Sequence, residues 1–346
     1  MAGPRVTVVV VLLTPMVVGF LAPVSVHPAA AYLVPSGRQS SVGHAQCRRT
    51  GRSGASGTIM AVEQQQKKQA IPPMTPRRKQ FFKMAMEGLR VGFEGQDIAK
   101  VERFVQYCKG ELDYEALGML HQPSEEYVED LRAKPWWEPE EFEWISKLEE
   151  KSDVVIDEFA AFWNDPKSSF ARDSKAMDIM GKGWSGVRLQ RLGDWIPENC
   201  GKFPNTVTLL KELEIPLAVR GVMFARQVPG SGVSPHSDGR NFILTTHLGV
   251  DVPDECWMRV GEEKRVWQNG KALVLDTSFE HETGNNSRKD RIVLIIDFWH
   301  PDLTQAEQEA LAFVYDLRNR FESGDIPLEE EEGGNFFGIF KKAFNQ

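Results

Sequence analysis

The sequence of 346 residues has few cysteines and no excess of positive charge. Its four cysteines are spread from position 47 to position 256 and form no C-x-x-C pair, which excludes a disulfide framework and a zinc ribbon. The formal net charge of −8 argues against a nucleic-acid-binding surface. No G-x-x-x-x-G-K-[ST] motif occurs, and the G-x-G-x-x-G match at 181–186 leads into a strand-like run rather than a helix, so nucleotide binding is not indicated.

Acidic side chains are missing from residues 1–62, which differ in kind from the rest of the chain. Arg5 precedes a mostly apolar run, Val6–Leu21, and three alanines follow a few residues later, which predicts a secretory signal peptide over 1–31. The alternative is a membrane anchor. The run is short for a bilayer span and contains Pro15, which favours a cleaved signal with no stable membrane span in the mature chain.

The next segment, 32–79, is expected to be a transit-like or disordered linker. Its first half is rich in arginine, serine and glycine and has no acidic residue, a composition typical of transit peptides, and its second half is polar with three prolines. A signal followed by such a segment resembles the bipartite plastid presequences of algae with secondary plastids. We therefore expect the protein to be located in an organelle that is reached through the secretory pathway, namely a plastid. The alternatives are secretion and anchoring in a membrane by the N-terminal apolar run.

Apolar spacing divides the remaining chain into three parts. Residues 80–182 contain two stretches with helical periodicity and are expected to form a helical region that packs on the core. Over 183–303 the apolar runs become short and are separated by turn residues, which is typical of an all-β sandwich or barrel. The expected strands are Val187–Leu192, Leu217–Gln227, Phe242–Val250, Cys256–Val260, Ala272–Leu275 and Arg291–Phe298, with one helix over Thr206–Leu213.

Residues 304–346 are predicted to begin with a helix and to end in an acidic run and a phenylalanine-rich tail. The tail contains Phe336, Phe337, Phe340 and Phe344 next to two lysines. It either packs on its own domain or makes a peripheral contact with a membrane or a partner.

The stretch "SPHSDGRN" contains two candidate metal ligands, His236 and Asp238, two residues apart. In a strand this spacing puts both side chains on one face, although a lone His-x-Asp match is a weak signal. His281 follows 45 residues later, just beyond the expected strand Ala272–Leu275. Two histidines and one carboxylate are the facial triad of non-haem Fe(II) oxygenases, and ligands of one ion would lie within about 4 Å of one another.

Two further residues suggest a cosubstrate site. Arg291 is the first residue of an apolar strand, an unusual position for a charged side chain. A guanidinium pairs well with a carboxylate, such as the distal carboxylate of 2-oxoglutarate. The alternative is a salt bridge with Asp290 or Asp297. His247 lies inside another apolar strand and is either a satisfied core residue or a hydrogen-bond partner of the cosubstrate. We expect no catalytic residue beyond the metal and cosubstrate ligands.

The segments "VPGSGVSPHSDGRNFILTTHLGV", "VLDTSFEHETGNNS" and "DRIVLIIDFWHPDL" resemble the aspartyl/asparaginyl β-hydroxylase domain family. The likeness extends over about 135–305. It implies an α+β fold with a double-stranded β-helix, jelly-roll or cupin-like core. It also implies a hydroxylase that uses Fe(II), 2-oxoglutarate and O₂. By motif, His236 and His281 would hold the metal, and Arg291 and His247 would contact 2-oxoglutarate.

Three positions differ from the animal protein hydroxylases of the family. Those enzymes have glycine where this chain has Asp238, and basic residues where it has Ile243 and Thr245. The resemblance therefore predicts a complete facial triad here, while the substrate stays open between an Asp- or Asn-like protein side chain and a lipid or small metabolite. A non-catalytic module that binds a metal or a carboxylate is the remaining alternative.

Overall fold

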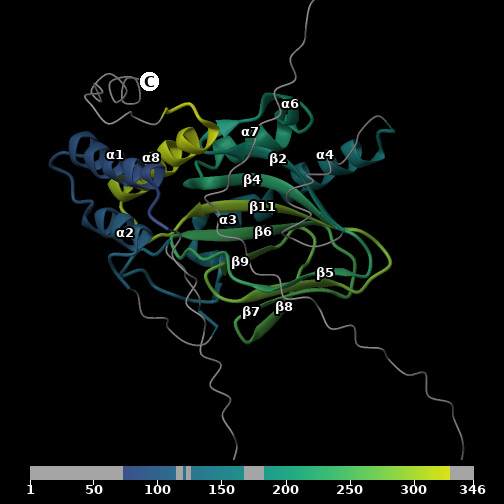
Figure 1. Ribbon diagram of the computed structural model, residues 1–346. Coiled ribbons are helices and arrows are strands. Elements are labelled where there is room, and N and C mark those ends of the chain that lie inside the picture. The colour runs from purple at the N-terminus through teal and green to yellow at the C-terminus, as the bar shows by residue number, and fades with distance from the viewer. Residues whose placement is uncertain (1–72, 114–119, 122–125, 167–182, 328–346) are drawn as a thin grey trace, which may run out of the picture. The chain divides into compact units, whose positions relative to one another are not determined.

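The computed structural model describes residues 73–113, 120–121, 126–166 and 183–327 (Figure 1). The predicted signal peptide, nearly all of the transit-like segment and the phenylalanine-rich tail lie outside these residues. Within them, no helix combines the length and the apolar character that a bilayer crossing requires.

Two antiparallel sheets form the core. The larger sheet has the strand order β1-β9-β6-β11-β4-β2-β3 and the smaller has the order β5-β10-β7-β8. The strands are β1 (Trp136–Trp137), β2 (Trp184–Arg191), β3 (Asp194–Trp195), β4 (Leu217–Gln227), β5 (Ser231–His236), β6 (Ile243–Asp251), β7 (Cys256–Val260), β8 (Glu263–Val266), β9 (Ala272–Asp276), β10 (His281–Asn285) and β11 (Arg291–Trp299). The strands from β4 to β11 alternate between the two sheets except at β7 and β8, which are neighbours in the smaller sheet. This is the strand order of a jelly roll, so the predicted α+β fold with a double-stranded β-helix is confirmed.

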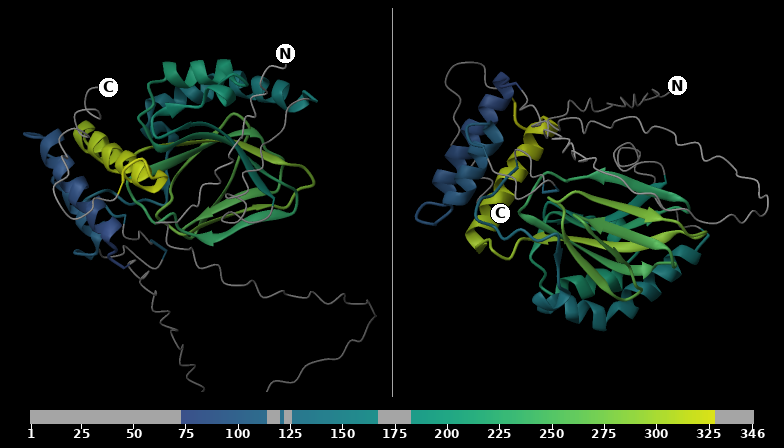
Figure 2. Two further views of the ribbon diagram at one scale, coloured as in Figure 1. Left: turned by 45° about the horizontal axis from the view of Figure 1, so that its top comes forward. Right: turned by 90° about the horizontal axis from the view of Figure 1, so that it is seen from below.

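The faces of the larger sheet differ in chemistry because successive side chains of a strand point to opposite sides. On β11, Ile292, Leu294 and Ile296 pack in a cluster with the helices α3 (Glu143–Glu150), α4 (Ser152–Asn164) and α7 (Pro204–Glu212). These helices cover the outer face of the sheet (Figure 2). The alternate residues of β11 face the smaller sheet. This alternation explains why polar residues at positions 291 and 297 interrupt an otherwise apolar strand: they lie on the inner face.

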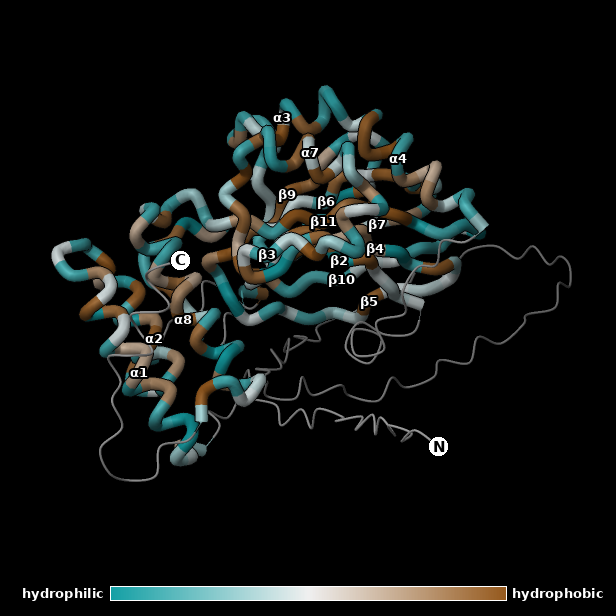
Figure 3. Tube along the Cα trace, turned by 90° about the horizontal axis from the view of Figure 1, so that it is seen from above, coloured by the Kyte–Doolittle hydropathy of each residue, from teal (hydrophilic) through white to brown (hydrophobic). Residues whose placement is uncertain are grey.

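A separate helical cluster contains α1 (Pro76–Gly92), α2 (Ala99–Lys109) and α8 (Gln305–Ser323). These helices share a core of phenylalanine, leucine and valine side chains with Phe242, Ile243 and Trp299 at the ends of β6 and β11. Their brown apolar stretches alternate with teal polar ones along the trace, as expected of helices buried on one side (Figure 3). Thr304 begins α8 with a reciprocal capping box to Glu307.

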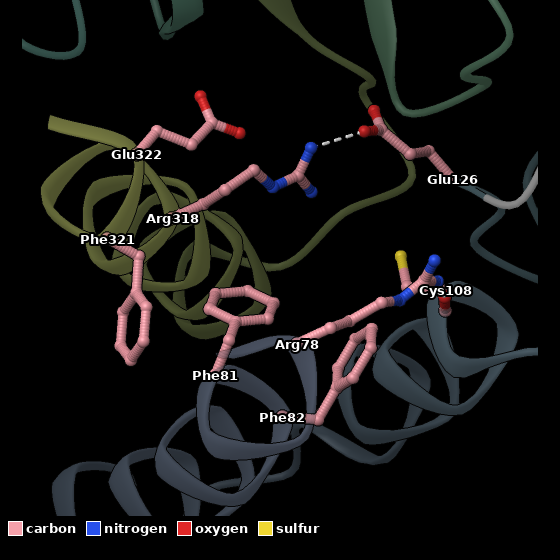
Figure 4. A pocket seen from close by; sticks show the side chains of 8 residues that line it. All are labelled: Arg78, Phe81, Phe82, Cys108, Glu126, Arg318, Phe321 and Glu322. Atoms are coloured by element: carbon pink, nitrogen blue, oxygen red, sulfur yellow. Dashed lines mark hydrogen bonds and ion pairs between the residues drawn. The ribbon is translucent and has the colours of Figure 1, made fainter. Parts of the chain in front are cut away.

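An ion pair joins α8 to the segment that precedes the core. Arg318 contacts the Glu126 carboxylate above a small cavity lined by Phe81, Phe82 and Phe321 (Figure 4). Glu126 also accepts a hydrogen bond from the Tyr315 hydroxyl and lies 3.4 Å, Oε2 to Nε, from Arg240. The helical cluster is thus connected electrostatically to the loop that follows β5.

All six strands expected from the sequence are present to within a few residues, as are the expected helices at α7 and α8. Helix α1 begins at Pro76, four residues before the periodic pattern, because Thr75 caps it and Pro76 suits the first turn. Strands β5, β8 and β10 were not expected. They are short and polar and belong to the smaller sheet, so they contain no run of apolar residues that would have predicted a strand.

Candidate metal and cosubstrate site

The two candidate histidines meet across the smaller sheet. His236 is the last residue of β5, His281 is the first of β10, and the two are directly paired in the antiparallel ladder. Their ring centroids are 4.2 Å apart. Strand pairing therefore brings together two residues that are 45 positions apart in the sequence.

The backbone fixes both imidazoles in the same tautomer. Nδ1 of His236 lies 2.8 Å from the carbonyl oxygen of Ser234, and Nδ1 of His281 lies 2.9 Å from that of Phe279. A carbonyl oxygen only accepts, so each Nδ1 carries the proton and each Nε2 keeps its lone pair. A backbone hydrogen bond on one nitrogen with the other nitrogen free is the arrangement that metal-binding histidines show.

Asp238 lies two residues beyond the end of β5, not within a strand as the i, i+2 argument assumed. Its side chain reaches the same site because its N–H donates to the carbonyl oxygen of Thr277, 2.9 Å away. The turn that leads into His281 therefore positions the aspartate as well. One ligand atom from each of His236, Asp238 and His281 lies within 4.8 Å of the others, with His236 Nε2 3.8 Å from Asp238 Oδ1. This spread is slightly wider than the roughly 4 Å expected between the ligands of one bound ion.

The protonation states of these residues suit a metal ion. Burial alone would raise the pKa of Asp238, but the Arg220 guanidinium, with smaller contributions from the two histidines, holds it well below its usual range. Burial, and then the neighbouring His236, lower the pKa of His281 to about 4. At neutral pH the aspartate is therefore ionised and His281 is neutral, the protonation states that metal binding requires.

A second cluster of polar side chains lies around Arg291, on the inner face of the larger sheet. The guanidinium is buried and donates from Nη2 to Oε1 of Gln227, 2.9 Å away, and its Cζ lies 4.6 Å from the centroid of the Trp267 ring. Neither predicted salt bridge forms, because Asp290 pairs with Arg226 and Asp297 with Arg220. Among the described residues, no carboxylate lies within ion-pair distance of Arg291.

His247 lies between the candidate metal ligands and Arg291. It is buried on β6, and its pKa is lowered well below the usual value by burial, then by the charge of Arg291, and to a lesser extent by His281. In the described part of the chain, His247 Nδ1 and Arg291 Nε are buried and lack hydrogen-bond partners. Such unsatisfied buried atoms are rare, and a carboxylate ligand would supply their acceptors. The residues present thus fit a dicarboxylate cosubstrate. Burial lowers the pKa of Arg291 to about 10, so it remains charged at neutral pH.

Gln227, Trp267 and Arg220 line the site but did not emerge from the sequence. Gln227 was visible as the last residue of a predicted strand, where a polar side chain on the inner face is a usable signal. Trp267 follows β8, which was not expected, so nothing in its local sequence indicated its place.

Comparison with known proteins agrees with this geometry. Residues 149–301 match the family Aspartyl/Asparaginyl beta-hydroxylase. The human aspartyl/asparaginyl beta-hydroxylase is 34% identical over 190 residues, which is 53% of this chain and 25% of that protein. The human aspartate beta-hydroxylase domain-containing protein 2 is 26% identical over 206 residues, 57% of this chain and 55% of that protein. The chain therefore covers about a quarter to a half of these relatives.

Among solved structures, an oxidoreductase of the 2OG-Fe(II) oxygenase family from Burkholderia pseudomallei matches 36% of this chain and 72% of its own, with 13% identity and a TM-score of 0.28. The sequence match over 149–301 includes the whole jelly roll and all three candidate metal ligands. Over this segment, the chain is similar to the aspartyl/asparaginyl β-hydroxylase family.

Proposed function

We propose that this protein is an Fe(II)- and 2-oxoglutarate-dependent dioxygenase that hydroxylates a C–H bond. The observation that carries the proposal is the convergence of His236, Asp238 and His281 within 4.8 Å. Two imidazoles and one carboxylate are the ligand set of non-haem Fe(II) oxygenases, and they leave coordination positions for a cosubstrate and O₂. When bound, the iron and 2-oxoglutarate supply the oxidative chemistry.

The residues of this chain bind and orient the reactants. Arg291 would pair with the distal carboxylate of 2-oxoglutarate, and His247 would offer a hydrogen bond from between that arginine and the metal ligands. The stacked ring of Trp267 keeps water away from the guanidinium. A charge-assisted pair in so dry a setting is stronger than one in water.

The proposed substrate is an Asp- or Asn-like side chain of a protein or peptide. This choice is supported by the names of the relatives, one an aspartyl/asparaginyl beta-hydroxylase and the other an aspartate beta-hydroxylase domain-containing protein. Within the fold, Ile243 is fully buried and Thr245 donates to Asp297, so neither position offers a cation to an acidic substrate. A lipid or small metabolite is therefore the alternative outcome of a substrate screen.

The test is the formation of succinate from 2-oxoglutarate by the purified protein with Fe(II) under air. We expect turnover that requires Fe(II) and that Asp238→Ala and His281→Ala each abolish. Peptide, lipid and metabolite pools are then searched by mass spectrometry for a product that gains one oxygen atom. Metal binding without any 2-oxoglutarate turnover would instead show a non-catalytic module, and absence of both would refute the assignment.

A further inference from the structure

Arg220 connects the candidate metal site to the inner face of the larger sheet. Its Nη1 donates to Oδ2 of Asp238, and its Nε lies 3.3 Å from Oδ2 of Asp297. Asp297 in turn accepts a hydrogen bond of 2.6 Å from the Thr245 hydroxyl through its other oxygen. The guanidinium is therefore held at two points, with Thr245 fixing the more distant carboxylate.

A bulge in β4 turns Arg220 toward the site. Further along β4, Met223 and Ala225 pack on the inner face while Val222 and Phe224 pack on the outer face, so simple alternation would place residue 220 outside. The register between β4 and β11 shifts at this point. Ile296 of β11 pairs with Val222 and Phe298 pairs with Leu217, so β4 contains extra residues over the same stretch. Extra residues on one strand re-aim the side chains beyond them.

Gly221 makes this bulge sterically possible. It has a φ of +74°, and a Cβ at this position would lie 2.0 Å from Oε1 and 2.2 Å from the carbonyl oxygen of Gln190. Only glycine fits both the conformation and the space. The orientation of Arg220 is thus built into the backbone of β4.

The bridge gives the two oxygens of Asp238 different roles. Oδ2 is occupied by Arg220, while Oδ1 faces Nε2 of His236 at 3.8 Å. We propose that Arg220 is a positioning residue that locks Asp238 as a ligand through one oxygen, with Asp297 and the β4 bulge holding the arginine in place. The proposal rests on the metal binding proposed above. Partners that orient a metal ligand from outside the coordination sphere typically affect metal affinity by about 10- to 100-fold.

A simpler role for Arg220 predicts the opposite result. A guanidinium this close to a divalent cation also repels it, so an arginine that only neutralised the aspartate would weaken metal binding. Its removal would then raise affinity, and lysine, which keeps the charge, would leave affinity unchanged. A positioning role requires two nitrogens in fixed geometry, which lysine does not have.

The experiment is the titration of the full chain with Mn(II) by calorimetry and by loss of the free-ion electron paramagnetic resonance signal. We expect Arg220→Gln and Arg220→Lys each to weaken Mn(II) binding about 10- to 100-fold. Asp297→Asn, which leaves the ligands untouched, should weaken it in the same direction. Arg226→Gln is the matched control on the same strand, because Arg226 pairs with Asp290, and it should bind Mn(II) like the wild type.

A double variant tests whether the effect passes through Asp238. Adding Arg220→Gln to Asp238→Ala should cause no further loss, because the carboxylate that it positions is gone. Unchanged or increased affinity in Arg220→Gln, or full affinity in Arg220→Lys, would overturn the proposal while the wild type still binds Mn(II). A wild type that binds no Mn(II) would instead refute the metal site itself. Circular dichroism of each variant confirms that it is folded.

Discussion

The indole of Trp267 lies parallel to the imidazole of His247, with ring centroids 6.0 Å apart and planes 11° apart. The guanidinium of Arg291 lies over the same indole. One aromatic side chain therefore contacts both residues expected to bind 2-oxoglutarate, and it restricts their rotation from one side. Trp267 is itself almost fully buried, in the inner-face core cluster that also contains Trp184 and Met258.

This contact predicts an optical signal for cosubstrate binding. Adding 2-oxoglutarate to the Mn(II)-loaded protein should change the tryptophan emission, because a carboxylate on Arg291 alters the charge next to the Trp267 ring. Trp267→Phe should keep the stacking but lose most of the change. Trp163→Phe is the control, since Trp163 is 39% exposed. If the emission change survives Trp267→Phe but disappears in Trp163→Phe, the cosubstrate binds elsewhere.

Arg291 is predicted to determine 2-oxoglutarate affinity without affecting the metal. Arg291→Gln removes a buried charge from a carboxylate pair, which costs about 2 kcal/mol or more, equivalent to a roughly 30-fold higher dissociation constant. Arg291→Lys keeps the charge but not the forked geometry, so its dissociation constant for 2-oxoglutarate should lie between those of the wild type and Arg291→Gln. Calorimetry with 2-oxoglutarate on Mn(II)-loaded protein measures both.

The control for this prediction is Arg265→Gln. Arg265 pairs with Glu263 and Glu138. Its loss should leave 2-oxoglutarate affinity unchanged. Equal Mn(II) affinity in all variants shows that the effect is confined to the cosubstrate. A normal 2-oxoglutarate affinity in Arg291→Gln would contradict the assigned role.

The sequence was most informative where a strand is long and buried on both faces. β6 and β11 were predicted because their apolar runs exceed what a loop tolerates, and polar residues within them, His247 and Arg291, were noticed for the same reason. The metal ligands were found through spacing and family likeness. In each case the feature could be predicted because its sequence pattern lies within one short segment or repeats at a fixed interval.

The missed features depend on contacts between distant segments. Simple alternation along β4 would point Arg220 outward, and the bulge at Gly221 that turns it inward is defined by pairing with the distant strand β11. β10 contains one of the metal ligands, yet its five residues "HETGN" have no apolar alternation. It is a strand because β5 and β7 pair with it on both sides.

Asp276 gives a prediction for stability against pH. Its side chain is 1% exposed, and burial raises its pKa to about 7, partly opposed by hydrogen bonds from the N–H and hydroxyl of Ser278. The folded state therefore keeps a proton that the unfolded state loses near pH 4. The resulting stability is present below about pH 4 and is lost as the pH rises to about 7, up to about 4 kcal/mol in total.

Asp276→Asn removes this titration with little change in shape. We expect urea unfolding to show the variant gaining stability relative to the wild type as the pH is raised from 5 to 8. The difference between the two proteins isolates Asp276 from every other titrating group. A difference that stays constant over this range would show that the carboxyl does not hold its proton in the folded state.

The Glu126 carboxylate is predicted to be the strongest single ionic contribution of the helical cluster. Its side chain is 12% exposed and meets Arg318, Arg240 and the Tyr315 hydroxyl, and the two arginines outweigh burial and lower its pKa to about 2. Glu126→Gln leaves two largely buried guanidinium groups without their counter-charge, which should cost about 3 kcal/mol of unfolding free energy.

The matched comparison is the exposed pair of Glu143 and Lys147 on α3, in which the glutamate side chain is 84% exposed. Glu143→Gln should cause a much smaller loss of unfolding free energy than Glu126→Gln, because an exposed pair one helical turn apart gains little over hydration. Urea unfolding of both variants at one pH gives the two values directly. Similar losses for the two variants would mean that water reaches Glu126 freely, and the connection between α8 and the loop after β5 would then contribute little to stability.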